Sequence, residues 1–132
     1  MNEPTVFIMT LAGNANLQAP TSGTIFTDAF RFGDVDYFAL SYKVACTGTP
    51  NVRIQMEQSI YQPALENVPD VNFGVPKSVG DIETTLTSKS IQHMQLNPVT
   101  ISYVRFKITE QTGLVTDTVV KIWLSLQKKF TQ

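Results

Sequence analysis

Strict alternation of apolar and polar residues is the feature that most constrains the fold of this chain. In residues 37–46 every second residue is apolar, and the residues between them are small or polar. The apolar set is Phe38, Leu40, Tyr42, Val44 and Cys46. A period of two places one set on each face of a β-strand, so the pattern predicts a strand with one buried face.

The same alternation continues in residues 52–61, after a five-residue turn, Thr47–Asn51, that contains glycine and proline. Its apolar set is Val52, Ile54, Met56 and Ile60. Two alternating strands joined by a short Gly/Pro turn are typical of an antiparallel hairpin. We therefore expect residues 37–46 and 52–61 to pair with each other.

The C-terminal half repeats this arrangement. Residues 102–109 and 117–127 both alternate, and a short polar link with Gly113 joins them, so a second hairpin is expected. The apolar sets are Val104, Phe106 and Ile108, then Val120, Ile122, Leu124 and Leu126.

Four further segments predict shorter strands. They are Val6–Leu11, which is apolar on both faces, Thr24–Phe32, with Phe26, Phe30 and Phe32 expected on one side, Ile82–Leu86, and Gln92–Leu96. Seven or eight strands at this spacing predict an all-β fold: one antiparallel β-sandwich domain, jelly-roll-like, over residues 1–132. Residues Gln62–Ser78 contain three prolines and predict a long loop, and loops of that length commonly carry contacts.

Charge narrows the set of partners. Ten Lys and Arg against eleven Asp and Glu give a net charge of −1, which argues against nucleic acid or an anionic membrane as the partner. Only 16% of residues are charged, against about 25% in a typical soluble domain. Because interface cores are depleted in charge, this composition favours assembly with other protein.

The surroundings in which the chain folds follow from three features. The single cysteine, Cys46, excludes an internal disulfide, and its apolar context predicts a buried thiol. The N-terminal residues resemble no signal peptide, and no apolar run reaches the length of a membrane span. We therefore expect folding in a reducing cytoplasm.

The residues needed for catalysis or metal binding are sparse. The only histidine, His93, has no nucleophile or orienting acid in its segment, and one Cys with one His cannot close a zinc site. Asp34 and Asp36 are the best calcium candidates, but no full set of ligands follows them. Glu57 and Glu83 are the carboxylates that a small jelly-roll glycosidase could use. We expect no enzyme activity, no metal and no cofactor.

Trp123 is the clearest candidate for a binding residue, because its position places it on the face opposite the aliphatic row of residues 117–127. Three interpretations are open. The indole packs under the long loop against Phe73, anchors a protein contact, or stacks on a sugar. The candidate interface residues are Trp123, Phe73, Tyr61, Tyr103, Phe7 and Met9.

Two parts of the chain together resemble a known class of protein. They are Asp36–Lys43 leading through the turn into Val52–Ser59, and Ser102–Thr109 followed by Asp117–Val120. This pattern resembles the small β-sandwich virion proteins of tailed bacteriophages, of the head-decoration or capsid-associated kind. The likeness covers about half of the chain, residues 35–61 and 98–127, and it carries over no functional residue.

The resemblance implies a structural protein of the virion, assembled in the host cytoplasm. Its partners would be other capsid or tail proteins and further copies of itself, with a trimer as the expected form. A carbohydrate-binding β-sandwich module, with a glycan as its ligand, is the alternative. In a virion protein, the apolar strand near the N-terminus would lie at a subunit boundary or add to a neighbour's sheet.

Overall fold

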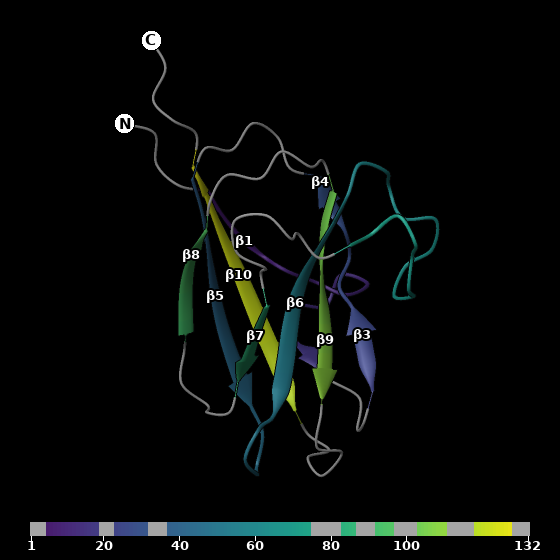
Figure 1. Ribbon diagram of the computed structural model, residues 1–132. Helices are drawn as coiled ribbons and strands as arrows, with labels where there is room; N and C mark the ends of the chain where they lie inside the picture. Colours follow the sequence, from purple (N-terminus) through teal and green to yellow (C-terminus); the bar gives the residue numbers. More distant parts are fainter. Residues whose placement is uncertain are drawn as a thin grey trace.

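In the computed structural model, the described residues are 5–18, 23–31, 37–74, 83–86, 92–96, 103–110 and 118–127. Their regular structure is entirely β-strand, in two antiparallel sheets that pack face to face (Figure 1). The strands are β1 (Thr5–Ile8), β2 (Leu17–Gln18), β3 (Thr24–Phe26), β4 (Phe30–Arg31), β5 (Tyr37–Ala45), β6 (Val52–Ser59), β7 (Glu83–Leu86), β8 (Gln92–Leu96), β9 (Tyr103–Glu110) and β10 (Val119–Gln127).

The strand order is that of a jelly roll. The first sheet runs β1-β10-β5-β8, and β2 continues the line of β1 along β10. The second sheet runs β3-β9-β6-β7, and β4 continues the line of β3 along β9. Each sheet therefore has four strand positions, and most connections cross between the sheets. The predicted all-β, jelly-roll-like sandwich of seven or eight strands is confirmed.

Both predicted hairpins are wrong. β5 pairs with β10 and β8, whereas β6 pairs with β7 and β9, so the turn at residues 46–51 crosses from one sheet to the other. In the same way β9 and β10 lie in different sheets. Six residues easily span the ~10 Å between packed sheets. The alternation within each strand is the same whether the next strand along the chain pairs with it or lies in the other sheet.

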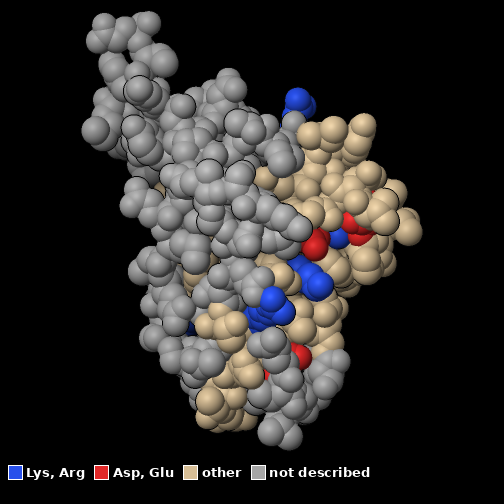
Figure 2. Space-filling model, in the orientation of Figure 1, with Lys and Arg blue, Asp and Glu red and all other residues tan. Residues whose placement is uncertain are grey.

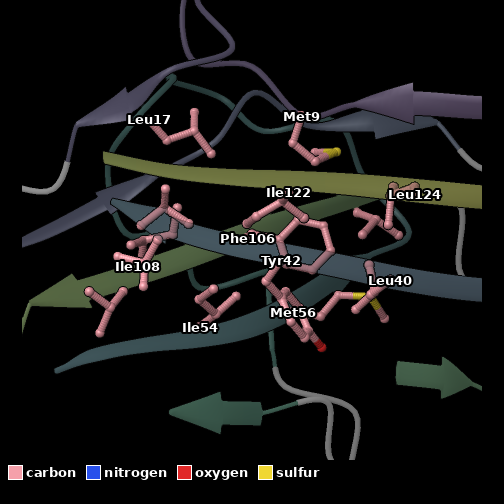
Figure 3. Close-up of a cluster of buried hydrophobic side chains, with 14 of the residues drawn as sticks. Met9, Leu17, Leu40, Tyr42, Ile54, Met56, Phe106, Ile108, Ile122 and Leu124 are labelled. Carbon is pink, nitrogen blue, oxygen red and sulfur yellow. The ribbon is translucent and has the colours of Figure 1, made fainter. Parts of the chain in front are cut away.

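The core lies between the sheets and consists of the alternating residues that the sequence predicts. Four long strands supply most of it (Figure 3). The buried residues of these strands include Leu40, Tyr42, Val44, Val52, Ile54, Met56, Val104, Phe106, Ile108, Val120, Ile122 and Leu124. Ile60 is an exception, because β6 ends at Ser59 and the Ile60 side chain is 65% exposed. Burial also raises the pKa of the Tyr42 hydroxyl to about 12.

One additional residue between β3 and β4 reverses the faces of their phenylalanines. Phe26 lies opposite Lys107 and Phe30 lies opposite Val104, so four steps along one strand match three along β9. This bulge turns Phe26 outward and leaves Phe30 against the core, which corrects the prediction that both lie on one side. Thr27 stabilises the bulge, because its backbone bonds to Phe106 and its Oγ1 accepts the Phe106 N–H at 2.9 Å.

The edge formed by β1 and β2 is also interrupted, by a tight turn at Leu11–Asn14. Ala12 and Gly13 both have positive φ, as a two-residue hairpin turn requires. The Asp28 carboxylate accepts hydrogen bonds from Thr10 Oγ1 at 2.8 Å and from the Ala12 N–H at 3.0 Å. This carboxylate therefore ties the turn of the first sheet to the bulge of the second. No helix in the described residues is long and apolar enough to cross a membrane.

Candidate protein-binding surfaces

Among the residues that the structure describes, large apolar side chains are exposed in two separate places. The first, which we call the edge patch, consists of Val6, Phe7 and Ile8 on β1 together with Trp123 on β10. The second, which we call the anchored loop, consists of residues 60–74, which directly follow β6. Its exposed apolar side chains are Ile60, Tyr61, Leu65 and Val71.

In the edge patch, three consecutive apolar residues are exposed on one short strand. Val6 is 61% exposed, Phe7 44% and Ile8 39%. Ile8 lies directly opposite Trp123, and paired residues lie on the same face of a sheet, so Val6, Ile8 and the Trp123 indole share the outer face of the first sheet. The indole is half-buried. Phe7 is on the inner face, where its ring lies 5.7 Å from that of Phe30. Apolar surface thus continues around the edge of the sheet from one face to the other.

The backbone of β1 adds hydrogen-bonding groups to this apolar edge. The Met9 N–H donates to the Ile122 carbonyl at 2.8 Å, which fixes the phase of pairing with β10. Backbone N–H and C=O groups point to alternate sides along a strand. Those of Phe7 therefore point towards β10, whereas those of Val6 and Ile8 point away from it. No described strand lies on that side of β1.

The anchored loop has a defined base. Gln58 and Gly74 exchange two backbone hydrogen bonds, of 2.9 and 3.0 Å, which close the loop where it leaves and rejoins the second sheet. Within it, Asp70 accepts the Asn72 N–H at 2.9 Å and the Ala64 N–H at 3.3 Å. Both hydrogen bonds lower the pKa of the Asp70 carboxyl, and the bond from Asn72 has the larger effect. The loop is therefore held by backbone hydrogen bonds at its base and by the Asp70 carboxylate within it.

A buried arginine fastens the loop to the sheet. Arg105 is 1% exposed although it lies on the outer face of β9. Its Nε donates to Glu57 Oε1 at 2.9 Å, and its Nη1 donates to the Val68 carbonyl at 2.8 Å. The guanidinium lies between two aromatic rings, 4.3 Å from the centroid of Phe26 and 4.4 Å from that of Phe73. Phe73 and Val68 belong to the loop, so this one side chain joins the loop to β3, β6 and β9.

The outer face of the second sheet beyond this loop is polar and carries both signs of charge. Figure 2 shows basic and acidic side chains close together on this side of the molecule. Arg53 and Lys107 are half-buried there, beside the Glu57–Arg105 pair. This mixture of charge contrasts with the edge patch, which has none.

The structure separates the predicted interface residues. Phe7 and Tyr61 are exposed, Trp123 is half-buried, and Tyr103 is half-buried at the start of β9. Met9 is 4% exposed and belongs to the core, so its assignment to a surface is wrong.

The proposed packing of Trp123 against Phe73 is also wrong, because the two residues lie on opposite outer faces of the sandwich. Phe73 stacks on Arg105 of the second sheet, and Trp123 belongs to the first sheet. The burial of Arg105 had no signal in the alternation, which places residue 105 on a polar face.

Candidates for chemistry come together nowhere in the described residues. Glu57 is held by Arg105, and Glu83 lies in β7 opposite Gln55. The backbone of His93 lies opposite Ser41, whereas Asp34 and Asp36 fall outside the described residues. Cys46 is half-buried, with its Sγ 3.1 Å from the Gly48 carbonyl, and so is less buried than predicted. No group of three or more His, Cys, Asp or Glu in the described part of the chain could hold a metal ion.

Comparison with known proteins gives no family. No family model matches the chain, and no curated protein matches it. Among solved structures, the mitogen of Yersinia pseudotuberculosis is 10% identical with a TM-score of 0.49, over 98% of this chain and 91% of that one.

Two carbohydrate-binding modules are similar at the same level. The C-terminal CBM6 of a laminarinase, LamC, from Zobellia galactanivorans is 12% identical, with a TM-score of 0.47 over 92% of this chain and 99% of that one. The xylan-binding module CBM86 from Roseburia intestinalis is 16% identical, with a TM-score of 0.40 over 97% of each chain. At these identities and scores the likenesses support no statement about function. The chain is a small jelly-roll β-sandwich that matches no family.

Proposed function

We propose that this chain is a structural protein that acts by binding other protein in a larger assembly. The observation that carries the proposal is the run of exposed apolar residues Val6, Phe7 and Ile8 on a strand at a sheet edge. Such edges pair readily with other chains, and proteins that stay single guard them with charge, proline or a bulge. Residues 5–8 contain none of these guards.

The anchored loop supports the same proposal. A flexible loop loses conformational entropy when a partner orders it, whereas this loop is already held by Arg105, Asp70 and the Gln58–Gly74 bridge. It presents Leu65 and Val71 in a prearranged position. The chain thus has two apolar surfaces on different sides of the sandwich, as a protein that joins neighbours in a particle requires.

The assembly that we propose is the virion of a tailed bacteriophage, on the strength of the sequence pattern described above. Particles purified from the source of the gene, analysed by quantitative mass spectrometry, test this. We expect many copies per particle at a constant ratio to the shell protein. Absence of the chain from every particle fraction would refute the virion assignment.

Carbohydrate binding is the second candidate, and one observation favours it. The half-buried indole of Trp123 lies beside Ser41 on an outer sheet face, which combines a ring for stacking with a hydroxyl group. Binding to a glycan array that Trp123→Ala abolishes would establish this function. A signal that Trp123→Ala leaves unchanged would count against it.

A further inference from the structure

We infer that the edge patch binds a second copy of this chain, with β1 pairing antiparallel to the partner's β1 across a two-fold axis at Phe7. This inference rests on the proposed function, because it names one partner for a surface already proposed to bind protein. The two first sheets would then form one continuous sheet through the pair.

The hydrogen-bonding pattern of β1 fits itself. Val6 and Ile8 direct N–H and C=O groups outward, and Phe7 between them directs its groups to β10. A two-fold axis at Phe7 places Val6 opposite the partner's Ile8, and each such pair exchanges two N–H···O=C bonds. Every outward group of Val6 and Ile8 is then used.

The side chains are also compatible with a copy of themselves. A two-fold contact places each residue beside residues of the same strand, so a charge near the axis would meet a like charge. Residues 5–8 are Thr, Val, Phe and Ile, with no charge. The pair would cover Val6 and Ile8 on the outer face and bring the exposed Phe7 rings together on the inner face.

The opposite sheet has no comparable edge at β3 and β4. The bulge at Thr27 interrupts that edge, and β4 ends with the charged Arg31. Bulges and charges of this kind prevent edge-to-edge pairing. The edge of the first sheet is interrupted as well, at residues 11–14, but β1 itself is unbroken over four residues and has no charge.

The contact area between the two copies is small, so the dimer forms only at high protein concentration. A strand of four residues buries less than the roughly 800 Å² per partner of a standard complex. The pair is therefore weak in dilute solution and forms when copies are concentrated, as on the surface of a particle. We infer this dimer in place of the trimer expected from the sequence.

The test is the mass of the full chain by light scattering over a concentration series, for wild type, Val6→Lys and Thr49→Lys. Val6 and Thr49 are both exposed, and Thr49 lies in the turn between β5 and β6, outside both binding surfaces, so both variants should keep the circular dichroism spectrum of wild type. We expect wild type and Thr49→Lys to shift from monomer to dimer, and Val6→Lys to remain a monomer throughout.

A cross-link locates the axis. In a Cys46→Ser background, Phe7→Cys places two thiols at a non-hydrogen-bonded pair about 4.5 Å apart between Cα atoms, which suits a disulfide. Val6→Cys is the matched control, because its two copies lie beyond disulfide reach. We expect oxidation to give a covalent dimer only with Phe7→Cys.

Failure of this inference is distinct from failure of the proposed function. A trimer, a dimer that Val6→Lys leaves intact, or a monomer at all concentrations with no Phe7→Cys cross-link would overturn the self-pairing. The proposed function would still stand if the chain were found in particles, and it falls only if no particle contains it.

Discussion

Replacing Arg105 should release the anchored loop, and the size of the effect follows from its contacts. Arg105→Ala removes the ion pair with Glu57, the hydrogen bond to the Val68 carbonyl and the contacts with both aromatic rings. Breaking a buried ion pair by removing one partner costs about 3–5 kcal/mol, because the remaining charge stays unpaired. The side chain of Glu57 is 13% exposed and can reach water in part, so we expect about 3 kcal/mol.

Two further variants separate charge from shape. Arg105→Lys keeps the charge but loses the planar group that lies between Phe26 and Phe73, and we expect a loss of about 2 kcal/mol. Glu57→Gln in the Arg105→Ala background should recover part of the stability, because it removes the unpaired carboxylate.

The assays are urea unfolding for the free energy and limited proteolysis for the loop. We expect Arg105→Ala to expose cleavage sites within residues 60–74 at denaturant concentrations where the sheets are still folded. A loss below about 1 kcal/mol, with loop cleavage unchanged, would refute the view that Arg105 anchors the loop.

Three other predictions test the core and the bulge. Tyr42 has a folded-state pKa of about 12 against an ordinary 10, so its stabilising effect is complete below pH 10 and is lost as the pH rises towards 12. Unfolding at alkaline pH should show a loss of about 3 kcal/mol that Tyr42→Phe removes, and an identical pH profile in the variant would contradict the assignment. Thr27→Val leaves the buried Phe106 N–H without its acceptor, so urea unfolding should show a loss of about 1–3 kcal/mol; an unchanged midpoint would mean that the bulge does not depend on this bond. Ile122→Ala creates a cavity between the sheets and should lower the free energy of unfolding by about 2–5 kcal/mol, and a loss below 1 kcal/mol would contradict the packing shown in Figure 3.

Alternation in the sequence predicts the strands and their buried faces well, because burial on one side imposes a period of two. The core residues of β5, β6, β9 and β10 all follow it. The same pattern cannot show which strand pairs with which, and this is why both hairpins were predicted in place of crossings between sheets.

The candidate surfaces were predictable only in part. The apolar strand at residues 6–8 and the outward position of Trp123 both follow from the sequence, since each departs from the pattern around it. Arg105 was not predictable, because its burial depends on a loop that covers the sheet and on the bulge that turns Phe26 outward. The bulge shifts the pairing of β3 and β4 with β9 by one residue, and neither the composition nor the spacing of apolar residues indicates such a shift.

The pairing of β1 with β10 has a consequence for synthesis. Ile8 lies opposite Trp123, so the ribosome must add more than a hundred residues after β1 before β10, the strand that pairs with it, has been made. At about 5–20 residues per second, translation takes on the order of ten seconds to cover that distance. During this time both edges of an uncharged apolar strand are open on a nascent chain, and on a polysome the nearest identical strand belongs to the next ribosome. Shielding residues 5–8 during synthesis should therefore increase the yield of folded protein.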